Sequence, residues 1–437
     1  MRRHRITAAA LSAVATGLGQ IYNRQYAKGA ILFLLYVAGI FYASTRLGGA
    51  IWGLVTLGET KQQMKLVGKV YVVTPGDHSI FLMVEGLIVV FAVLVFVAIH
   101  IGNVADAYRR GKEREEGKRL HNIRETFHYV LTWKFPFIII TLPLLFVFFF
   151  SVLPILFSVL IAFTNYSSPN YLPPANLVDW IGFDSFKNMF SLSKWTGTFY
   201  GVLGWTIVWA VVSTATTFFG GFAVALLVQQ KGIRLRAMWR TIFMLPFAIP
   251  AFLSLLIIRN MFNSQFGPIN QYLGRLGITG PEWMSDPIWA KVTVVLANMW
   301  LGFPISMLLI IGILTTIPRD LYEAADVDGA SPFQKFKAIT LPSVMFALSP
   351  ILIGQFAGNI NNFNVIFLMT GGGPVNSDYQ FAGSTDILIT WLYNLSISNG
   401  KYNFASVVGI ILFLIIASLS IHSFRRTRAF REDDLLR

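Results

Sequence analysis

Eight long apolar stretches constrain this chain more than any other feature of its sequence. A helix needs about 20 mostly apolar residues to cross a bilayer, and none of the stretches shows the alternation of a barrel strand. Their approximate boundaries are 29–46, 79–102, 134–164, 199–229, 238–262, 287–315, 343–369 and 403–426. Charged residues make up 13% of the chain, about half of the roughly 25% found in soluble domains. We therefore expect an all-α polytopic membrane protein with about eight transmembrane helices.

The positive charges divide the loops into two sets. Of the 35 Lys and Arg residues, 25 fall in 1–28, 103–134, 230–240, 316–342 and 425–437. Loops rich in Lys and Arg stay on the cytoplasmic side, so both termini are expected in the cytoplasm. The loops 47–78, 165–198, 263–286 and 370–402 are then expected outside. Basic cytoplasmic loops also account for the net charge of +14 without a nucleic-acid partner.

Residues 6–22 can be interpreted in two ways. Arg2, Arg3 and Arg5 precede them, and a secretory signal peptide also begins with basic residues. The stretch is only weakly apolar, however, and it contains Gln20. We therefore favour a helix that lies at the membrane interface, with a signal peptide as the alternative.

Ionisable side chains are nearly absent from the apolar stretches, although ion-coupled carriers usually depend on them. The polar residues there are mostly amides: Gln355, Asn359 and Asn362 are spaced to share one helical face, and Asn298 lies one stretch earlier. Such amides can hold helices together. They can also line a cavity, where they donate to and accept from sugar hydroxyls. Five amides within the ten residues 355–364 favour the cavity.

The sequence also excludes several kinds of chemistry. It contains no cysteine, so disulfides, thiolate metal sites and cysteine nucleophiles are ruled out. No phosphate-binding GxxxxGK[ST] loop occurs, so this chain does not hydrolyse ATP itself. We expect a transport subunit rather than an enzyme, with no metal or cofactor of its own.

The loop 316–342 carries the most specific pattern. Pro318 is suited to begin a short helix, Gly329 to end it, and Ser331-Pro332 to begin a second one. The spacing resembles the EAA loop of bacterial ABC importer permeases. The matching positions are Glu323, Ala324, Ala325, Asp328, Gly329, Ile339, Leu341 and Pro342. In that family the loop inserts into a groove of the ATPase subunit, so the resemblance implies docking by Glu323 and a turn at Gly329.

Further segments resemble the larger permease of the maltose/maltodextrin importers, a family of binding-protein-dependent sugar transporters. These segments are MLPFAIP at 244–250, FNSQFG at 262–267, NMWLGFP at 298–304, NINNFN at 359–364 and TGGGP at 370–374. The resemblance covers about 134–426 and implies the six-helix core of a type I importer. The run QIYNRQYAKG at 20–29 resembles the N-termini of related permeases from Gram-positive bacteria.

The same resemblance implies a sugar site. Its positions in this chain are Phe247, Ala251, Asn298, Leu301, Gly302, Ile305, Asn359 and Asn362. Phe247 and Ala251 stand where the maltose permease has Tyr and Ser, while Ile305 and Gly358 replace aromatic residues. These departures remove hydroxyls and rings from the cavity, so they leave a longer or different oligosaccharide open.

We therefore expect a permease subunit of an ATP-driven importer for oligosaccharides of the maltose/maltodextrin type, working by alternating access. The expected partners are a second homologous permease forming a heterodimer, two ATPase subunits that bind ATP and Mg²⁺, an extracellular solute-binding protein and membrane lipid. The expected location is the bacterial cytoplasmic membrane. The expected segments are 1–28 at the interface, 29–133 with two accessory helices and a basic linker, 134–426 as transport core, and a tail at 427–437. An ion-coupled sugar carrier and a polytopic membrane enzyme are the alternatives.

Overall fold

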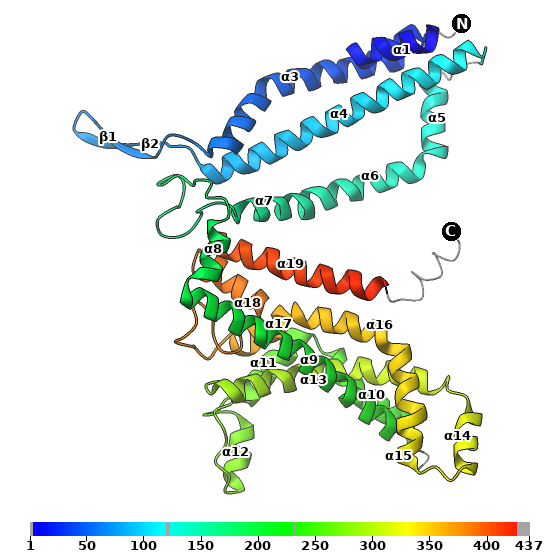
Figure 1. The fold of residues 1–437 in the computed structure, drawn as a ribbon, viewed down its shortest axis with the longest axis vertical. Coiled ribbons are helices and arrows are strands. Elements are labelled where there is room, and N and C mark those ends of the chain that lie inside the picture. Colours follow the sequence, from blue (N-terminus) through cyan, green and yellow to red (C-terminus); the bar gives the residue numbers. More distant parts are fainter. Residues whose placement is uncertain (1–2, 119–122, 231, 426–437) are drawn as a thin grey trace. The chain divides into compact units, whose positions relative to one another are not determined.

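The chain divides into two compact units, residues 1–182 and 183–437 (Figure 1). The computed structural model describes residues 3–118, 123–230 and 232–425, so the expected tail at 427–437 lies outside the described residues. The two units are defined by compactness, whereas the segments expected from the sequence, with a transport core over 134–426, are defined by function. Those functional segments stay a prediction.

Unit 1 consists of helices and one β-hairpin. Its helices are α1 (Arg3–Val14), α2 (Leu18–Tyr22), α3 (Tyr26–Thr56), α4 (Ser79–Glu115), α5 (Ile123–Trp133), α6 (Phe135–Val147) and α7 (Leu153–Ile161). A π-helical turn, η1 (Phe148–Val152), joins α6 to α7 into one long segment. The hairpin strands β1 (Gln63–Val67) and β2 (Val70–Thr74) are antiparallel and connect α3 to α4.

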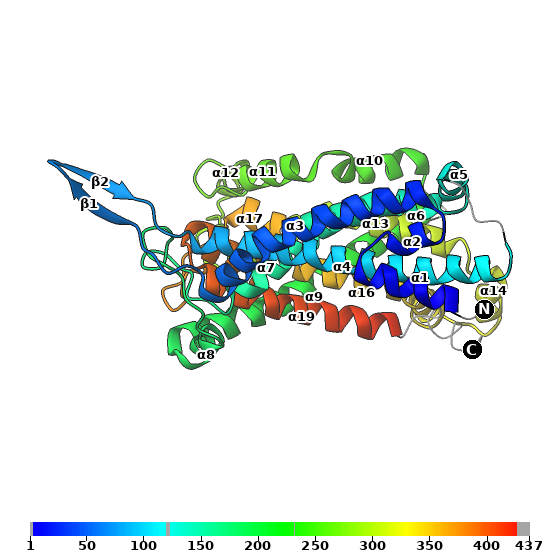
Figure 2. The same ribbon diagram turned by 90° about the horizontal axis from the view of Figure 1, so that it is seen from above.

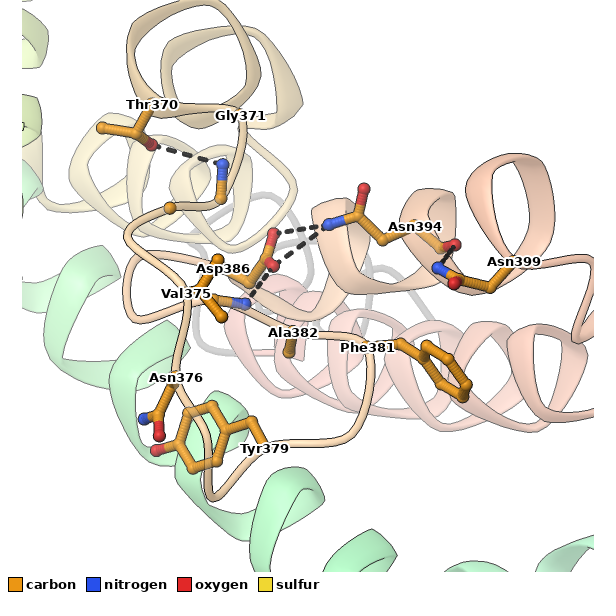
Figure 3. Close-up of a pocket in the computed structure, with 13 residues that line it drawn as sticks. Thr370, Gly371, Val375, Asn376, Tyr379, Phe381, Ala382, Asp386, Asn394 and Asn399 are labelled. Atoms are coloured by element: carbon orange, nitrogen blue, oxygen red, sulfur yellow. Dashed lines mark hydrogen bonds between the residues drawn. The ribbon is translucent and has the colours of Figure 1, made fainter. Parts of the chain in front are cut away.

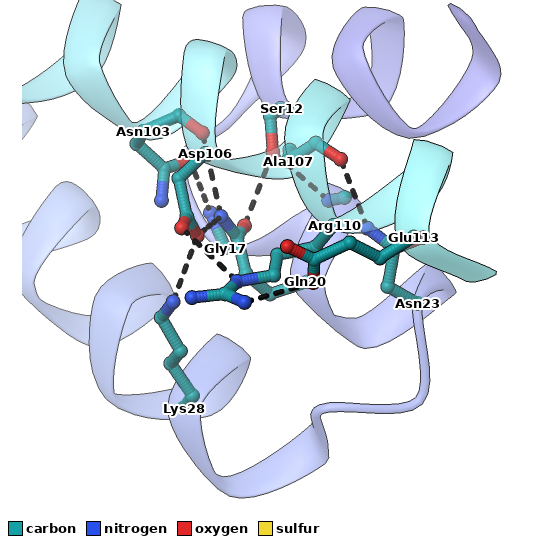
Figure 4. A network of polar contacts seen from close by, with 11 residues as sticks. Ser12, Gly17, Gln20, Asn23, Lys28, Asn103, Asp106, Ala107, Arg110 and Glu113 are labelled. Atoms are coloured by element: carbon teal, nitrogen blue, oxygen red, sulfur yellow. Dashed lines mark hydrogen bonds and ion pairs between the residues drawn. The ribbon is translucent and has the colours of Figure 1, made fainter. Parts of the chain in front are cut away.

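The N-terminal helices are tied to α4 by buried and half-buried polar contacts (Figure 4). The Gln20 amide donates to the Asp106 carboxylate over 3.1 Å, Lys28 pairs with the same carboxylate at 2.7 Å, and the Asn23 amide donates to the carbonyl of Ala107 over 3.1 Å. Residues 3–22 form two helices rather than one, because Gly17 adopts a φ of +97° that L-residues rarely tolerate. Residues of the run QIYNRQYAKG thus anchor the N-terminal helices to α4. The expected position of residues 6–22 at the membrane interface stays a prediction.

Unit 2 is built from helices joined by loops. Its helices are α8 (Asp184–Ser191), α9 (Ser193–Gln229), α10 (Arg236–Ala248), α11 (Ala251–Met261), α12 (Pro268–Arg275), α13 (Pro287–Leu314), α14 (Arg319–Val327), α15 (Pro332–Lys335), α16 (Leu341–Ile360), α17 (Phe363–Thr370), α18 (Leu388–Tyr393) and α19 (Tyr402–Arg425). Two π-helical turns complete unit 2. The first, η2 (Phe336–Thr340), joins α15 to α16, and the second, η3 (Asn394–Ser398), follows α18.

Membrane-length helices account for the apolar stretches. Within the described residues, 7 helices are long and apolar enough to span a membrane, and the bent pair α10 and α11 makes up to 8. This confirms the expected all-α polytopic class. Among the helix pairs of unit 2, α9 and α13 form the most extensive packing contact. The two helices approach closely where their residues are small. A Cβ on Gly221 would lie 2.6 Å from the Ser306 Cβ, and one on Gly302 would lie 2.5 Å from the Thr217 Cγ2.

Two expected spans are broken in the structure. The stretch 238–262 bends by 92° between α10 and α11, because Pro250 lacks an N–H and disfavours helical geometry at Ile249 before it. The stretch 343–369 is not one helix either: a continuous helical segment runs over Pro332–Ile360, and α17 begins only at Phe363. The prediction of one shared helical face was therefore wrong for Asn362, which has φ −82° and ψ 76° and caps α17.

Candidate functional site

Three asparagines meet where α16 ends and α17 begins. The Asn362 amide donates to the Asn298 side-chain oxygen on α13 over 3.0 Å. The Asn359 amide donates to the Thr214 hydroxyl on α9 over 3.0 Å. Longer contacts of 3.5 Å run from the Asn298 and Asn362 amides to the Asn359 side-chain oxygen. We call Asn298, Asn359 and Asn362 the amide cluster.

The helix break at the cluster is held by α9. The indole N–H of Trp209 donates to the backbone carbonyl of Asn359 over 2.9 Å, which satisfies one of the carbonyls that a helix leaves unpaired at its C-terminus. Trp209 is fully buried. Sequence analysis missed both Trp209 and Thr214, because they lie about 150 residues before Asn359 and no spacing rule connects them to it.

The remaining predicted sugar-site residues are placed differently. Leu301 packs against the buried core cluster of α9, α13 and α17, and Gly302 faces Thr217 on α9. Phe247, Ala251 and Ile305 are exposed on α10, α11 and α13. The structure thus brings the three asparagines together and leaves Phe247, Ala251 and Ile305 on open helix surfaces.

The amide cluster has a defined chemistry. Asn298 is 8% and Asn359 is 6% exposed, and burying an amide is costly unless it finds hydrogen-bond partners. Each amide carries two donors and an acceptor but no charge. Such a cluster can exchange its mutual hydrogen bonds for bonds to the hydroxyls of a neutral ligand, and it carries no charge to neutralise an ionic one.

The loop 316–342 has the predicted helix–turn–helix form. Helix α14 covers Glu323, Ala324 and Ala325. The turn follows at Gly329, where φ is +74° and no atom lies within 4 Å of a Cβ position, so backbone geometry rather than crowding calls for glycine. Ser331 then caps α15 through a reciprocal capping box with Gln334.

The two halves of this loop are joined by side chains. The Tyr322 and Thr340 hydroxyls are hydrogen-bonded at 2.9 Å, and Lys335 pairs with Asp326. Ile339 lies in the π-helical turn η2, and Leu341 and Pro342 begin α16. Glu323, Ala324 and Asp328 are exposed. Exposed apolar side chains accompany them, with Val327 at 88% and Phe333 at 70% exposure. The loop therefore offers a prominent, internally braced surface.

A second polar feature lies in the loop after α17 (Figure 3). Asp386 is 1% exposed and lines a cavity of about 480 Å³. Its carboxylate accepts from the Gly383 N–H at 2.8 Å and from the Asn394 amide at 3.1 Å. Burial raises the pKa of Asp386 to about 6, against the opposing effect of these hydrogen bonds. Sequence analysis placed Asp386 only in an outer loop and did not anticipate its burial, and its contacts show a role in holding the loop together.

Comparisons with known proteins agree with this architecture. The family described as "Binding-protein-dependent transport system inner membrane component" matches residues 218–428. The galactooligosaccharides transport system permease GanP of Bacillus subtilis is 40% identical over 99% of this chain and 100% of its own length. The maltodextrin transport system permease MalC of Streptococcus pneumoniae is 35% identical over 100% of this chain and 99% of its own.

A solved structure shares the fold. A bacterial ABC transporter involved in the import of the acidic polysaccharide alginate contains a chain with a TM-score of 0.53, 20% identity, and coverage of 69% of this chain and 99% of that chain. Because relatives above 30% identity span the whole sequence, this chain belongs to the binding-protein-dependent inner-membrane components, as an oligosaccharide permease of the ABC importers.

Proposed function

We propose that the amide cluster forms one wall of the translocation path for a neutral oligosaccharide. The observation that carries this proposal is the meeting of three uncharged amides at a helix break, with Asn298 and Asn359 buried and Asn362 half-buried. The exposed Phe247, Ala251 and Ile305 belong to the same path in this proposal, since their open helix surfaces leave room for a second permease to complete the cavity. Leu301 and Gly302 support the wall from behind.

The substrate we propose is a maltodextrin. The permease MalC, with 35% identity, supports this choice. Galactooligosaccharides are the second candidate, because the galactooligosaccharide permease GanP is 40% identical to this chain. The loss of rings and hydroxyls at Phe247, Ala251 and Ile305 suits a site that follows a flexible chain of hexoses rather than one that grips a single disaccharide.

The loop 316–342 is the proposed contact with the ATPase subunits. Its exposed Glu323, Ala324 and Asp328 lie beside exposed apolar side chains, which is the composition of a docking surface with an apolar centre and a polar rim. Ala325 in α14, Ile339 in η2, and Leu341 and Pro342 at the start of α16 complete the proposed coupling pattern. Two ATPase subunits would bind ATP and Mg²⁺ and drive the transport that this chain only conducts.

The complete assembly is proposed to contain further partners. A second, homologous permease forms the heterodimer, and an extracellular solute-binding protein delivers the sugar, as the family description of binding-protein dependence supports. The membrane is the bacterial cytoplasmic membrane, with both termini inside as the Lys and Arg distribution indicates. Family membership favours this importer over the ion-coupled carrier.

Sugar-dependent ATP hydrolysis by the purified assembly in lipid nanodiscs tests the proposal. Maltodextrins and galactooligosaccharides of increasing length are compared for stimulation. Asn359→Ala is expected to abolish stimulation by sugar, whereas Asn364→Ala, an exposed amide on α17, is expected to leave it intact. Equal effects of the two variants would refute the cluster as the sugar site.

A second set of variants tests the coupling loop. Glu323→Ala is expected to uncouple hydrolysis from transport without weakening sugar binding. Gly329→Ala adds backbone strain of roughly 1–2 kcal/mol at its positive φ, so we expect weaker co-purification of the ATPases. Normal ATPase association and transport in both variants would refute the loop as the docking site.

A further inference from the structure

The β-hairpin of unit 1 has no covering partner within its own unit. Every residue of β1 and β2 is exposed except Thr74. A two-stranded hairpin is at best marginally stable in water unless one of its faces is covered, and both outer edges of this one have unpaired backbone groups. We therefore expect another surface to cover the hairpin in the working assembly.

The register gives the hairpin one wholly apolar face. Met64 pairs with Val73, and Leu66 pairs with Tyr71. Directly paired residues point to the same face, and residues two apart along a strand share it. The four side chains are 73%, 46%, 59% and 69% exposed respectively. They form a continuous apolar face, which we call the Tyr71 face.

The base of the hairpin is held rigidly. The Asp77 carboxylate accepts from the backbone N–H groups of Glu59 and Thr60, both at 2.9 Å, and from the Thr60 hydroxyl at 2.7 Å. These bonds lower the pKa of Asp77, and the bond from the Thr60 N–H has the largest effect. A Cβ on Gly76 would lie 2.3 Å from the Gln62 nitrogen, so the two strands of the neck are in close contact. A fixed neck aims the hairpin in one direction.

That direction leads away from the membrane. In both views the hairpin extends beyond the ends of α3 and α4 instead of folding back along them (Figures 1 and 2). Five residues in each strand at about 3.3 Å per residue carry it roughly 17 Å outward. Because α3 and α4 are membrane-length helices, a hairpin that continues past their ends reaches water rather than lipid.

The hairpin also has a distinct charge. Residues 60–75 contain Lys61, Lys65 and Lys69 and no acidic residue. Lys61 lies at the base of the hairpin and Lys69 in its turn, while Lys65, paired with Val72, lies on the face opposite to the Tyr71 face. A hairpin with this net positive charge and one apolar face fits a protein surface with an apolar centre and acidic surroundings. We propose that the Tyr71 face docks the extracellular solute-binding protein on an acidic patch; this rests on the proposed function and on the outward orientation of the loop 47–78.

The test uses the full assembly in nanodiscs, together with the solute-binding protein that stimulates its ATP hydrolysis. The variant Leu66→Ser/Tyr71→Ser removes the apolar face. The control Val70→Ser/Val72→Ser makes two equivalent changes on the opposite face of the same hairpin. We expect the concentration of solute-binding protein needed for half-maximal stimulation to rise about tenfold in the first variant and less than about twofold in the control, with basal hydrolysis unchanged in both.

Two further measurements define the partner. Lys65→Gln/Lys69→Gln is expected to flatten the dependence of the half-maximal concentration on salt, since exposed charges steer association through a screened field. A photo-crosslinking residue at Tyr71 is expected to link to the solute-binding protein.

Several results would overturn the inference. They are unchanged half-maximal concentrations, equal shifts in variant and control, or crosslinks from Tyr71 only to lipid or to the second permease. If the unmodified assembly shows no stimulation by any solute-binding protein, the proposed function fails and this inference fails with it. If stimulation is normal and the Leu66→Ser/Tyr71→Ser variant behaves as the parent, only the docking inference fails.

Discussion

Hydrogen-bond lengths within the amide cluster predict which pairs of residues are energetically coupled. Asn298 and Asn362 are joined at 3.0 Å, the usual length of an N–H···O bond. Asn298 and Asn359 are joined at 3.5 Å, where such a bond is weak. The residues in the two pairs are chemically identical and adjacent, so a difference in coupling can come only from geometry.

The magnitude follows from what such bonds contribute inside membranes. Double-mutant cycles in a membrane protein average about 0.6 kcal/mol per side-chain hydrogen bond, with a maximum near 1.7 kcal/mol. We expect the cycle of Asn298→Ala with Asn362→Ala to give a coupling of about 0.6–1.7 kcal/mol. The cycle of Asn298→Ala with Asn359→Ala is expected to give a smaller coupling, below about 0.6 kcal/mol, because a contact of 3.5 Å is a weaker bond within the same network. Equilibrium unfolding in mixed micelles measures all four states of each cycle.

The third pair in the network gives an internal standard. Thr214 and Asn359 are joined at 3.0 Å, so Thr214→Val with Asn359→Ala is expected to couple as strongly as the first pair, and Thr214→Ser to restore the coupling. The reasoning is refuted if the 3.5 Å pair couples more strongly than either 3.0 Å pair, or if all three cycles are additive.

Three further predictions concern packing and ionisation. Gly221→Val is expected to destabilise the protein by about 1–3 kcal/mol or more through overpacking against α13, because a Cβ at Gly221 would lie 2.6 Å from the nearest atom. Gly220→Ala is expected to be tolerated, because a Cβ there would lie 3.5 Å from the nearest atom. The folded yield after size-exclusion chromatography distinguishes the two variants. The raised pKa of Asp386 means that the folded state takes up this proton more readily than the unfolded chain, so the melting temperature falls as the pH rises from about 4 to about 6, and Asp386→Asn removes this dependence. The lowered pKa of Asp77 has the opposite effect: the stability that its carboxylate contributes is present above about pH 4 and is lost below it. Hydrogen exchange of the backbone amides in the hairpin neck measures this loss. Asp77→Asn is expected to lose the protection from exchange at neutral pH as well.

Apolar length predicted the membrane helices well, because a bilayer imposes one dominant requirement on a spanning segment. The same length argument could not locate breaks inside apolar runs. Between Asn359 and Phe363 the chain leaves and re-enters helix within four residues, a change that hydrophobicity does not register. Pro250 was a visible signal of the other break, but a proline inside an apolar run is compatible with both a mild kink and the observed 92° bend.

The candidate site was predictable in part for a similar reason. Side-chain chemistry identified Asn298, Asn359 and Asn362, since amides in hydrocarbon are exceptional wherever they occur. Their supports were not predictable. Trp209 and Thr214 are ordinary residues of an apolar helix, and only the packing of α9 brings them to the break. The hairpin was overlooked because its Lys residues served to orient the loop, while its period-2 apolar pattern lies within a short segment between two much stronger signals.

One element connects the two proposed functional regions. The continuous helical segment Pro332–Ile360 begins in the loop 316–342 and ends at the amide cluster. Its 29 residues at about 1.5 Å each make a rod of roughly 43 Å, enough to cross the bilayer. At one end Lys335 pairs with Asp326 of α14, and at the other the carbonyl of Asn359 is held by Trp209. Helix α9 packs along this segment: the Phe222 ring lies 5.4 Å from the Phe336 ring near one end, and Trp209 and Thr214 hold Asn359 at the other. In the proposed assembly, a docked ATPase that moves the near end would act on a helix held at both ends. The 3.5 Å amide contacts at the break are the weakest bonds there and would be the first to exchange for bonds to sugar.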